Sequence, residues 1–159
     1  MLYNSNIVTN SPMILTPIGF VKSPLKEPTY ERLNLKEIIS EIVIDANLTE
    51  ALDGLEGFSH IIVLYWMHRA KAERKNLKTH PMGRQDVLPQ GIFVVRTPNR
   101  PNPIGKQTVR LLERRGNMLK VQGLDAIDGT PVIDIKPYIP GYDSATNATT
   151  PDWVIREEE

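Results

Sequence analysis

The sequence lacks cysteine. None of its 159 residues can therefore form a disulfide bond, a thiolate zinc site, an iron–sulfur cluster or a cysteine nucleophile. Long apolar runs are also lacking. The longest, residues 61–67, is far too short to cross a membrane, and no basic and apolar leader occurs before Pro17. We therefore expect a cytoplasmic protein without a membrane segment.

Nucleotide-binding and metal-binding motifs are missing as well. No Gly-x-Gly-x-x-Gly follows an expected strand and no Gly-x-x-x-x-Gly-Lys-Ser/Thr occurs, which argues against a Rossmann site and a P-loop. The three histidines lack His-Glu-x-x-His spacing. His60 and His68 would lie about 26 Å apart on a straight strand, at about 3.3 Å per residue. We expect no metal site.

The charged residues are divided unevenly along the chain. The net charge is zero, but residues 69–115 hold 12 of the 19 lysines and arginines and three of the 19 acids, a net charge of +9. The remainder carries −9. Such segregation predicts a local basic face if the fold gathers these side chains. The alternative is that the lysine-rich part is only a solvated, disordered loop.

Short β-rich segments dominate a chain of single-domain length. We expect strands at residues 14–21, 37–48, 61–67, 91–97, 104–114, 118–125 and 131–137, with 61–67 central. Thr49 is expected to cap a short helix at 50–53 that Gly54 terminates, and Gly116-Asn117 fits a hairpin turn. Residues 69–90 are expected to be a long, mobile loop. Many closely spaced strands with few helices indicate a β-barrel or a sandwich.

One expected strand leads into a loop rich in proline. Residues 91–106 read Gly-Ile-Phe-Val-Val-Arg-Thr-Pro-Asn-Arg-Pro-Asn-Pro-Ile-Gly-Lys. Three prolines stiffen the chain, and stiffness lowers the entropy lost when a loop closes on a ligand. Arg96 and Arg100 are planar, charged donors suited to carboxylate or phosphate. The alternative is a tight corner between strands with solvated arginines.

This loop and three other stretches together resemble a known family. They are residues 17–25 (Pro-Ile-Gly-Phe-Val-Lys-Ser-Pro-Leu), 54–61 (Gly-Leu-Glu-Gly-Phe-Ser-His-Ile), 96–105 (Arg-Thr-Pro-Asn-Arg-Pro-Asn-Pro-Ile-Gly) and 124–138 (Leu-Asp-Ala-Ile-Asp-Gly-Thr-Pro-Val-Ile-Asp-Ile-Lys-Pro-Tyr). In this order they resemble the TsaA-like, or TrmO, family of tRNA methyltransferases over about residues 14–143. The resemblance implies one mainly β domain over residues 1–159, an antiparallel β-barrel with a few short helices, frayed ends and a homodimer.

The resemblance also implies S-adenosylmethionine as methyl donor. The family's donor site corresponds here to Ser23, Pro24, Leu25, Ser59, His60, Arg96, Lys106, Gln122, Gly123, Leu124 and Asp125. Methyl transfer mainly requires positioning of donor and nucleophile. No general base is evident, and Asp125 and His60 are the candidates that the motifs carry. Each also has a plainer role, His60 as a histidine at a strand end and Asp125 as a turn residue.

The implied acceptor is N6 of threonylcarbamoyladenosine beside the tRNA anticodon. Its carboxylate suits Arg100, and its base can stack on Tyr138, Tyr142 or Trp66. Within the basic block we expect a phosphate-binding face made by Arg69, Lys71, Arg74, Lys75, Lys78 and Arg84. Two alternatives stay open: a module that binds S-adenosylmethionine without turnover, and a methyltransferase for another small substrate.

Overall fold

The computed structural model describes residues 13–28 and 34–154, and the predicted fraying of the extreme ends falls outside them. The elements, in chain order, are β1 (Gly19–Lys22), η1 (Leu35–Glu37), β2 (Ile39–Ile44), η2 (Ala46–Leu52), η3 (Leu55–Gly57), β3 (His60–Trp66), β4 (Lys78–Thr79), η4 (Pro81–Gly83), β5 (Gln90–Gly91), η5 (Ile92–Val94), β6 (Ile104–Arg115), β7 (Met118–Gln122), β8 (Pro131–Pro137) and α1 (Pro140–Asp143). Here η denotes a 3₁₀ helix. No helix in the described ranges has the length and hydrophobicity that a membrane span requires.

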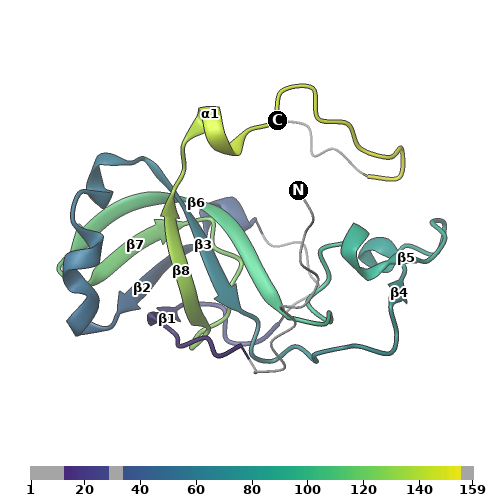
Figure 1. Cartoon of the computed structure of the whole chain (residues 1–159), viewed down its shortest axis with the longest axis horizontal. Helices are drawn as coiled ribbons and strands as arrows, with labels where there is room; N and C mark the ends of the chain where they lie inside the picture. The colour runs from purple at the N-terminus through teal and green to yellow at the C-terminus, as the bar shows by residue number, and fades with distance from the viewer. Residues whose placement is uncertain (1–12, 29–33, 155–159) are drawn as a thin grey trace, which may run out of the picture.

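Six strands close into an antiparallel barrel in the order β1-β2-β7-β6-β3-β8 (Figure 1). Closure comes from β1 and β8, where Gly19 pairs with Val132 and Phe20 with Pro131. The long strand β6 pairs with β3 through its first half and with β7 through its second half. The predicted mainly β, antiparallel barrel with few short helices is therefore confirmed.

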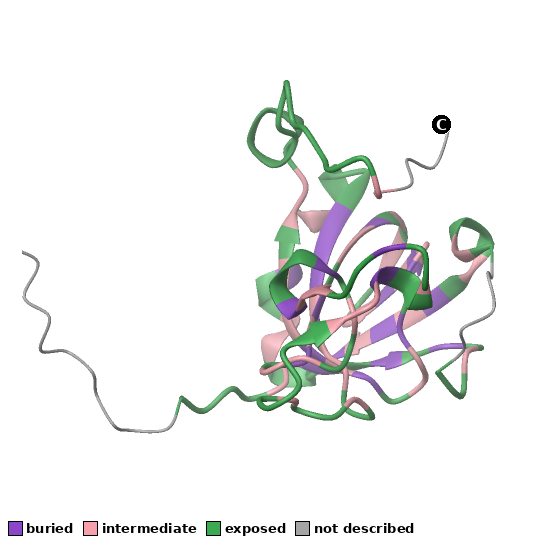
Figure 2. Cartoon of the chain, turned by 90° about the vertical axis from the view of Figure 1, so that its right-hand side faces the viewer, coloured by how far each residue is buried: buried purple, intermediate pink, exposed green. Residues whose placement is uncertain are grey.

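The hydrophobic core fills this barrel. Its fully buried members include Ile42, Ile61, Val109 and Leu119, each from a different strand. Alternate residues along each strand face the barrel interior, so every strand contributes side chains to the core. Figure 2 shows the buried residues running along the barrel strands. Gly19 lets two strands approach closely, since a Cβ there would lie 2.3 Å from the carbonyl oxygen of Val43. The barrel is thus a filled scaffold, and binding must use its ends or its outer face.

The connection from β7 to β8, residues 123–130, crosses one end of the barrel, because these strands are not neighbours in the closed order. Leu124 and Ala126 from this connection are buried in the core cluster. The Gly123 amide donates to the carbonyl of Ile38, and the Asp128 amide to that of Leu25, at 2.9 and 2.7 Å. The connection therefore closes the barrel end and brings the segments after β1 and β7 together.

Residues 78–94 form a small unit beside the barrel (Figure 1). Here β4 and β5 form a two-stranded sheet, whereas an irregular loop was predicted for residues 69–90. The predicted strand at 91–97 is wrong: only Gly91 belongs to β5, and residues 92–94 form η5. Phe93 is 77% exposed. A β-favouring composition does not produce a barrel strand here because the closed barrel has no free edge to pair with.

Other predicted bounds need smaller corrections. The first strand begins at Gly19 rather than residue 14, and the second ends at Ile44, before η2. The helix predicted at 50–53 is part of η2, whose N-cap is Asp45. The Thr49 hydroxyl donates to the Ala46 carbonyl at 2.7 Å instead of capping. The strand predicted at 131–137 is found with the same bounds, and those predicted at 61–67, 104–114 and 118–125 are found with shifted ends. Gly116, at φ 57°, makes the predicted turn between β6 and β7.

Candidate functional site

The loop after β1 is held by residues from the other side of the barrel end. Ser23 is buried, and its amide donates to the Asp128 carboxylate at 3.0 Å. Its hydroxyl accepts a hydrogen bond from the amide of Leu25 at 3.1 Å and lies 3.4 Å from the Ser40 hydroxyl. Lys26 pairs with the second Asp128 oxygen at 3.0 Å. Asp128 thus fixes the Ser23-Pro24-Leu25 turn, a role that the sequence, showing only a turn aspartate, did not reveal.

The predicted donor residues after β7 lie on the neighbouring connection. The Gln122 side chain donates to the Lys36 carbonyl at 2.8 Å, and Gly123 adopts φ 94°. Leu124 is fully buried, whereas Asp125 is exposed. The structure therefore brings two predicted groups, residues 23–25 and 122–125, to one end of the barrel. An open hollow of about 520 Å³ lies there, lined by Lys22, Ser23, Lys26, Ile39, Ser40, Glu41, Lys120 and Asp128.

Asp125 carries a carboxylate that is partly shielded from water. Its pKa is raised above the ordinary value because the surrounding protein displaces part of the water around its carboxylate. Within the described residues, the structure records no hydrogen bond or ion pair for this carboxylate. A cationic or hydroxyl-bearing ligand would supply the missing partner.

Ser59 and His60 form a separate group with Tyr138. The Ser59 hydroxyl lies 2.9 Å from His60 Nδ1, and the rings of His60 and Tyr138 meet edge to face at 6.4 Å. His60 and Gln122 both pair with Arg110, so their backbones lie two strand spacings, about 10 Å, apart. Directly paired residues share a sheet face, which puts exposed Arg110 between two predicted donor residues on the outer surface. Only cross-strand register reveals Arg110, and sequence analysis missed it.

The remaining predicted donor residues are dispersed. Arg96 is exposed in the loop between η5 and β6, and it has no hydrogen bond or ion pair to any residue in the described ranges. Lys106 is exposed on the outer face of β6, where its ammonium lies 3.3 Å from the Thr108 hydroxyl. Arg100 folds back on its own loop and donates to the Val95 carbonyl at 3.3 Å. In this single chain, no recorded contact joins Arg96 or Lys106 to the two loops at the barrel end.

The basic segment after β3 runs alongside the proline-rich loop. Ala72 and Arg100 form a parallel bridge, and the Glu73 amide donates to the Arg100 carbonyl at 3.2 Å. The side chains of Asn99 and Asn102 accept hydrogen bonds from the Lys71 amide and the Arg74 guanidinium at 3.2 and 3.3 Å. The two loops therefore lie side by side, so their exposed lysines and arginines belong to one region of the surface.

Not every predicted basic residue is free on that surface. Arg69 pairs with Glu27, and Arg84 pairs with Asp86 while donating to the Trp153 carbonyl at 3.0 Å. Lys75 and Lys78 are exposed and form no ion pair with a described residue.

The three candidate aromatic residues do not converge. Trp66 lines an apolar hollow of about 340 Å³ together with Asn102 and Ile104. Tyr138 packs on His60, at the opposite end of β3, and Tyr142 is 91% exposed in α1. Stacking of a single base on all three is excluded in this chain.

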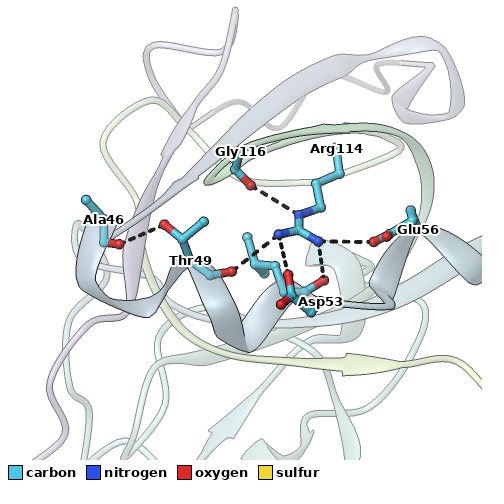
Figure 3. A network of polar contacts seen from close by, with 7 residues as sticks. Ala46, Thr49, Asp53, Glu56, Arg114 and Gly116 are labelled. Atoms are coloured by element: carbon cyan, nitrogen blue, oxygen red, sulfur yellow. Dashed lines mark hydrogen bonds and ion pairs between the residues drawn. The ribbon is translucent and has the colours of Figure 1, made fainter.

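Arg114 is the centre of a network that supports the segment before Ser59 (Figure 3). Its guanidinium pairs with Asp53 at 2.8 Å and Glu56 at 3.2 Å. It also donates to the carbonyls of Leu52, Thr49 and Gly116. The network ties η2 and η3 to the turn after β6, which is a structural role.

No group of three or more metal-ligating side chains gathers in the part of the chain that the structure describes. The absence of a metal site stays a prediction from the spacing of the histidines in the sequence.

Comparison with known proteins gives a consistent result. The family model of the tRNA-methyltransferase O N-terminal domain matches residues 21–144. A probable S-adenosyl-L-methionine-binding protein of Methanothermobacter thermautotrophicus is 48% identical over 134 residues, covering 82% of this chain and 93% of that protein. The tRNA (adenine(37)-N6)-methyltransferase of Mus musculus is 42% identical over 101 residues, 64% of this chain and 23% of the mouse protein.

A solved structure extends the likeness to the fold. The crystal structure of TrmO from Pseudomonas aeruginosa superposes with a TM-score of 0.71 at 31% identity. The match covers 89% of this chain and 62% of the solved chain, so this chain spans less than two thirds of that protein.

Proposed function

Because this chain belongs to the tRNA-methyltransferase O family of S-adenosylmethionine-dependent methyltransferases, we propose that it methylates N6 of threonylcarbamoyladenosine beside the tRNA anticodon. The observation that supports this most directly is that Asp128 joins the motif loop at residues 23–25 to the connection that carries residues 123–125, at one barrel end.

The donor fits the charges available on these residues. S-adenosylmethionine carries a sulfonium, an ammonium, a carboxylate and ribose hydroxyls. Asp125, whose pKa is raised by burial, suits a hydroxyl or cationic group. Arg96, exposed and without a described partner, suits the carboxylate. We propose that Ser23, Pro24, Leu25, Ser59, His60, Lys106, Gln122, Gly123 and Leu124 complete this site, largely through their backbone.

The protein's contribution to the reaction is positioning and proton removal. Bound S-adenosylmethionine supplies an electrophilic methyl group on sulfur, and the acceptor nitrogen must be held in line with it. N6 forms the new bond to carbon as the carbon–sulfur bond breaks, its electron pair remains on sulfur, and N6 loses one proton. Asp125 and His60 are the candidates to accept that proton. Burial raises the pKa of Asp125, which makes its carboxylate a stronger base than that of an ordinary aspartate.

We place the acceptor on the surface formed by the proline-rich loop and the basic segment. Arg100 would pair with the carboxylate of the modified base, and Arg74, Lys75 and Lys78 with phosphates. The contacts of Asn99 and Asn102 with residues 71 and 74 support a common surface. Trp66, which lines a hollow together with Asn102 of the proline-rich loop, is the candidate aromatic residue beside this surface, and its ring suits stacking on the base.

A methyl-transfer assay tests the proposal. Transfer of labelled methyl from S-adenosylmethionine to total tRNA is expected, with the label in N6-methylated threonylcarbamoyladenosine. The same tRNA lacking the threonylcarbamoyl group should accept none. Label in another nucleoside would change the acceptor but keep the enzyme class.

A second candidate is a binding module without turnover, favoured by relatives that are named only for binding S-adenosylmethionine. Donor binding with no product on any modified tRNA would support this module. We further propose a homodimer, the commonest oligomer, acting in the cytoplasm where a tRNA acceptor is met. A monomeric mass at micromolar concentration would contradict the dimer.

A further inference from the structure

Tyr65 reaches from the barrel interior to the proposed donor loop. It lies near the end of β3, is only 6% exposed and belongs to the core cluster. Its hydroxyl donates to the backbone carbonyl of Asp125 at 2.8 Å. Burial, and secondarily the charge of Asp125, raises the pKa of Tyr65 above its ordinary value.

Gly105 makes room for this tyrosine. It pairs with Tyr65 across β3 and β6, and a Cβ at residue 105 would lie 2.3 Å from both Cε2 and Cζ of the ring. The ring therefore occupies the space that a side chain at residue 105 would need. Gly105, the last residue of the Pro103-Ile104-Gly105 stretch, thus has a physical role: without a side chain, it leaves room for the Tyr65 ring over β6.

The contact lies midway along the connection that crosses the barrel end. One side of this connection is fixed by the amide of Gly123 on the Ile38 carbonyl, and the other by the amide of Asp128 on the Leu25 carbonyl. Between these anchors, the Asp125 carbonyl accepts the hydrogen bond from the Tyr65 hydroxyl. Leu124 and Ala126 hold the connection through their buried side chains, and loss of that bond removes the contact that orients the Asp125 peptide between them.

We propose that Tyr65, seated on Gly105, is a positioning residue for methyl-donor binding: it fixes the backbone of residues 123–126 from inside the barrel. This inference rests on the proposed placement of the donor against residues 122–125. It extends the site from its surface residues to a buried residue that contacts neither donor nor acceptor.

Tyr65→Phe tests the inference with little change in core volume. We expect the dissociation constant of S-adenosylmethionine, measured by calorimetric titration, to rise roughly three- to tenfold, the loss expected for one neutral hydrogen bond. Amide hydrogen exchange at Gly123–Ala126 should accelerate, while exchange in β6 and β7 stays unchanged. Gly105→Ala displaces the ring itself and should weaken donor binding further than Tyr65→Phe.

Ile44→Val is the matched control for general destabilisation. Ile44 is 2% exposed in β2, and removal of one methylene there has a stability cost comparable to that of a hydrogen bond. Donor affinity should stay at the wild-type value in this control. Wild-type affinity and unchanged exchange at Gly123–Ala126 in Tyr65→Phe would overturn the positioning role alone. A wild-type protein that binds no S-adenosylmethionine would instead overturn the proposed function, and the inference with it.

Discussion

The amide of Ser23 donates a hydrogen bond to the carboxylate of Asp128 at 3.0 Å, although the two residues are 105 positions apart. The same carboxylate pairs with Lys26. One aspartate therefore connects the first motif of the chain to the last, and the shape of the proposed donor site depends on it.

Asp128→Ala should weaken S-adenosylmethionine binding by roughly three- to tenfold, because the Ser23 amide loses its acceptor and the first loop its anchor. Calorimetric titration measures this. Asp128→Asn, which keeps an oxygen acceptor for the amide, should fall between the alanine variant and the wild type. Equal affinity in all three proteins would show that Asp128 is only a turn residue.

The stability contributed by Asp128 should depend on pH. Its pKa is lowered, first by the Ser23 amide and then by Lys26, so the folded state favours the carboxylate. That contribution is present above the unfolded pKa, ordinarily near 3.8, and is lost as pH falls through the lower folded value. Urea unfolding from about pH 7 to about pH 3 should therefore show a difference between wild type and Asp128→Ala that shrinks below about pH 4. A difference independent of pH would contradict this assignment.

Arg96→Ala should weaken S-adenosylmethionine binding at least tenfold, because a charge-assisted contact is worth about 1.5–3 kcal/mol. Calorimetric titration again decides. Arg115→Ala is a suitable control, since Arg115 is exposed at the other end of β6 and pairs with Glu113. Wild-type affinity in a folded Arg96 variant would remove Arg96 from the donor site.

Joint replacement of Arg74, Lys75 and Lys78 by alanine should weaken tRNA binding broadly. Each lost phosphate contact should reduce the slope of log affinity against log salt by about one. Filter binding across a salt series measures both quantities. Donor affinity should barely change, which separates this surface from the donor site.

The matched control replaces Lys36, Arg115 and Lys136, three basic residues that lie outside residues 69–100 and line neither hollow, and it should keep the wild-type salt slope. If both triple variants behave like the wild type, the segregated charge is incidental.

Gly19→Ala should destabilise the fold by about 1–3 kcal/mol, because the added methyl meets the backbone of Val43 and Ile44, which cannot turn aside. Gly57→Ala, where nothing lies within 4 Å of the added Cβ, should change stability by less than about 1 kcal/mol. Urea midpoints compare the two. Equal midpoints would mean that the strands separate at Gly19 without cost.

Local patterns predicted local structure well. The β6–β7 hairpin was predictable because Gly116-Asn117 carries its turn signal within two residues. The error at 91–97 has a different origin: a run of β-favouring residues does not reveal whether the sheet is closed. Asp128 and Tyr65 were missed because their partners, Ser23 and Asp125, are distant in sequence. Arg110 was missed for the same reason, since register alone places it between His60 and Gln122.

Barrel closure also sets an order of events during synthesis. β1 leaves the ribosome first, yet one of its two neighbours is β8, the last strand of the barrel. Pairing across so long a stretch of chain is slow and must follow the more local hairpins. One edge of β1, the strand before the Ser23 loop, therefore stays unpaired until nearly the whole domain has been synthesised. A nascent chain halted before Pro131 would hold every barrel strand except β8, which closes the barrel against β1.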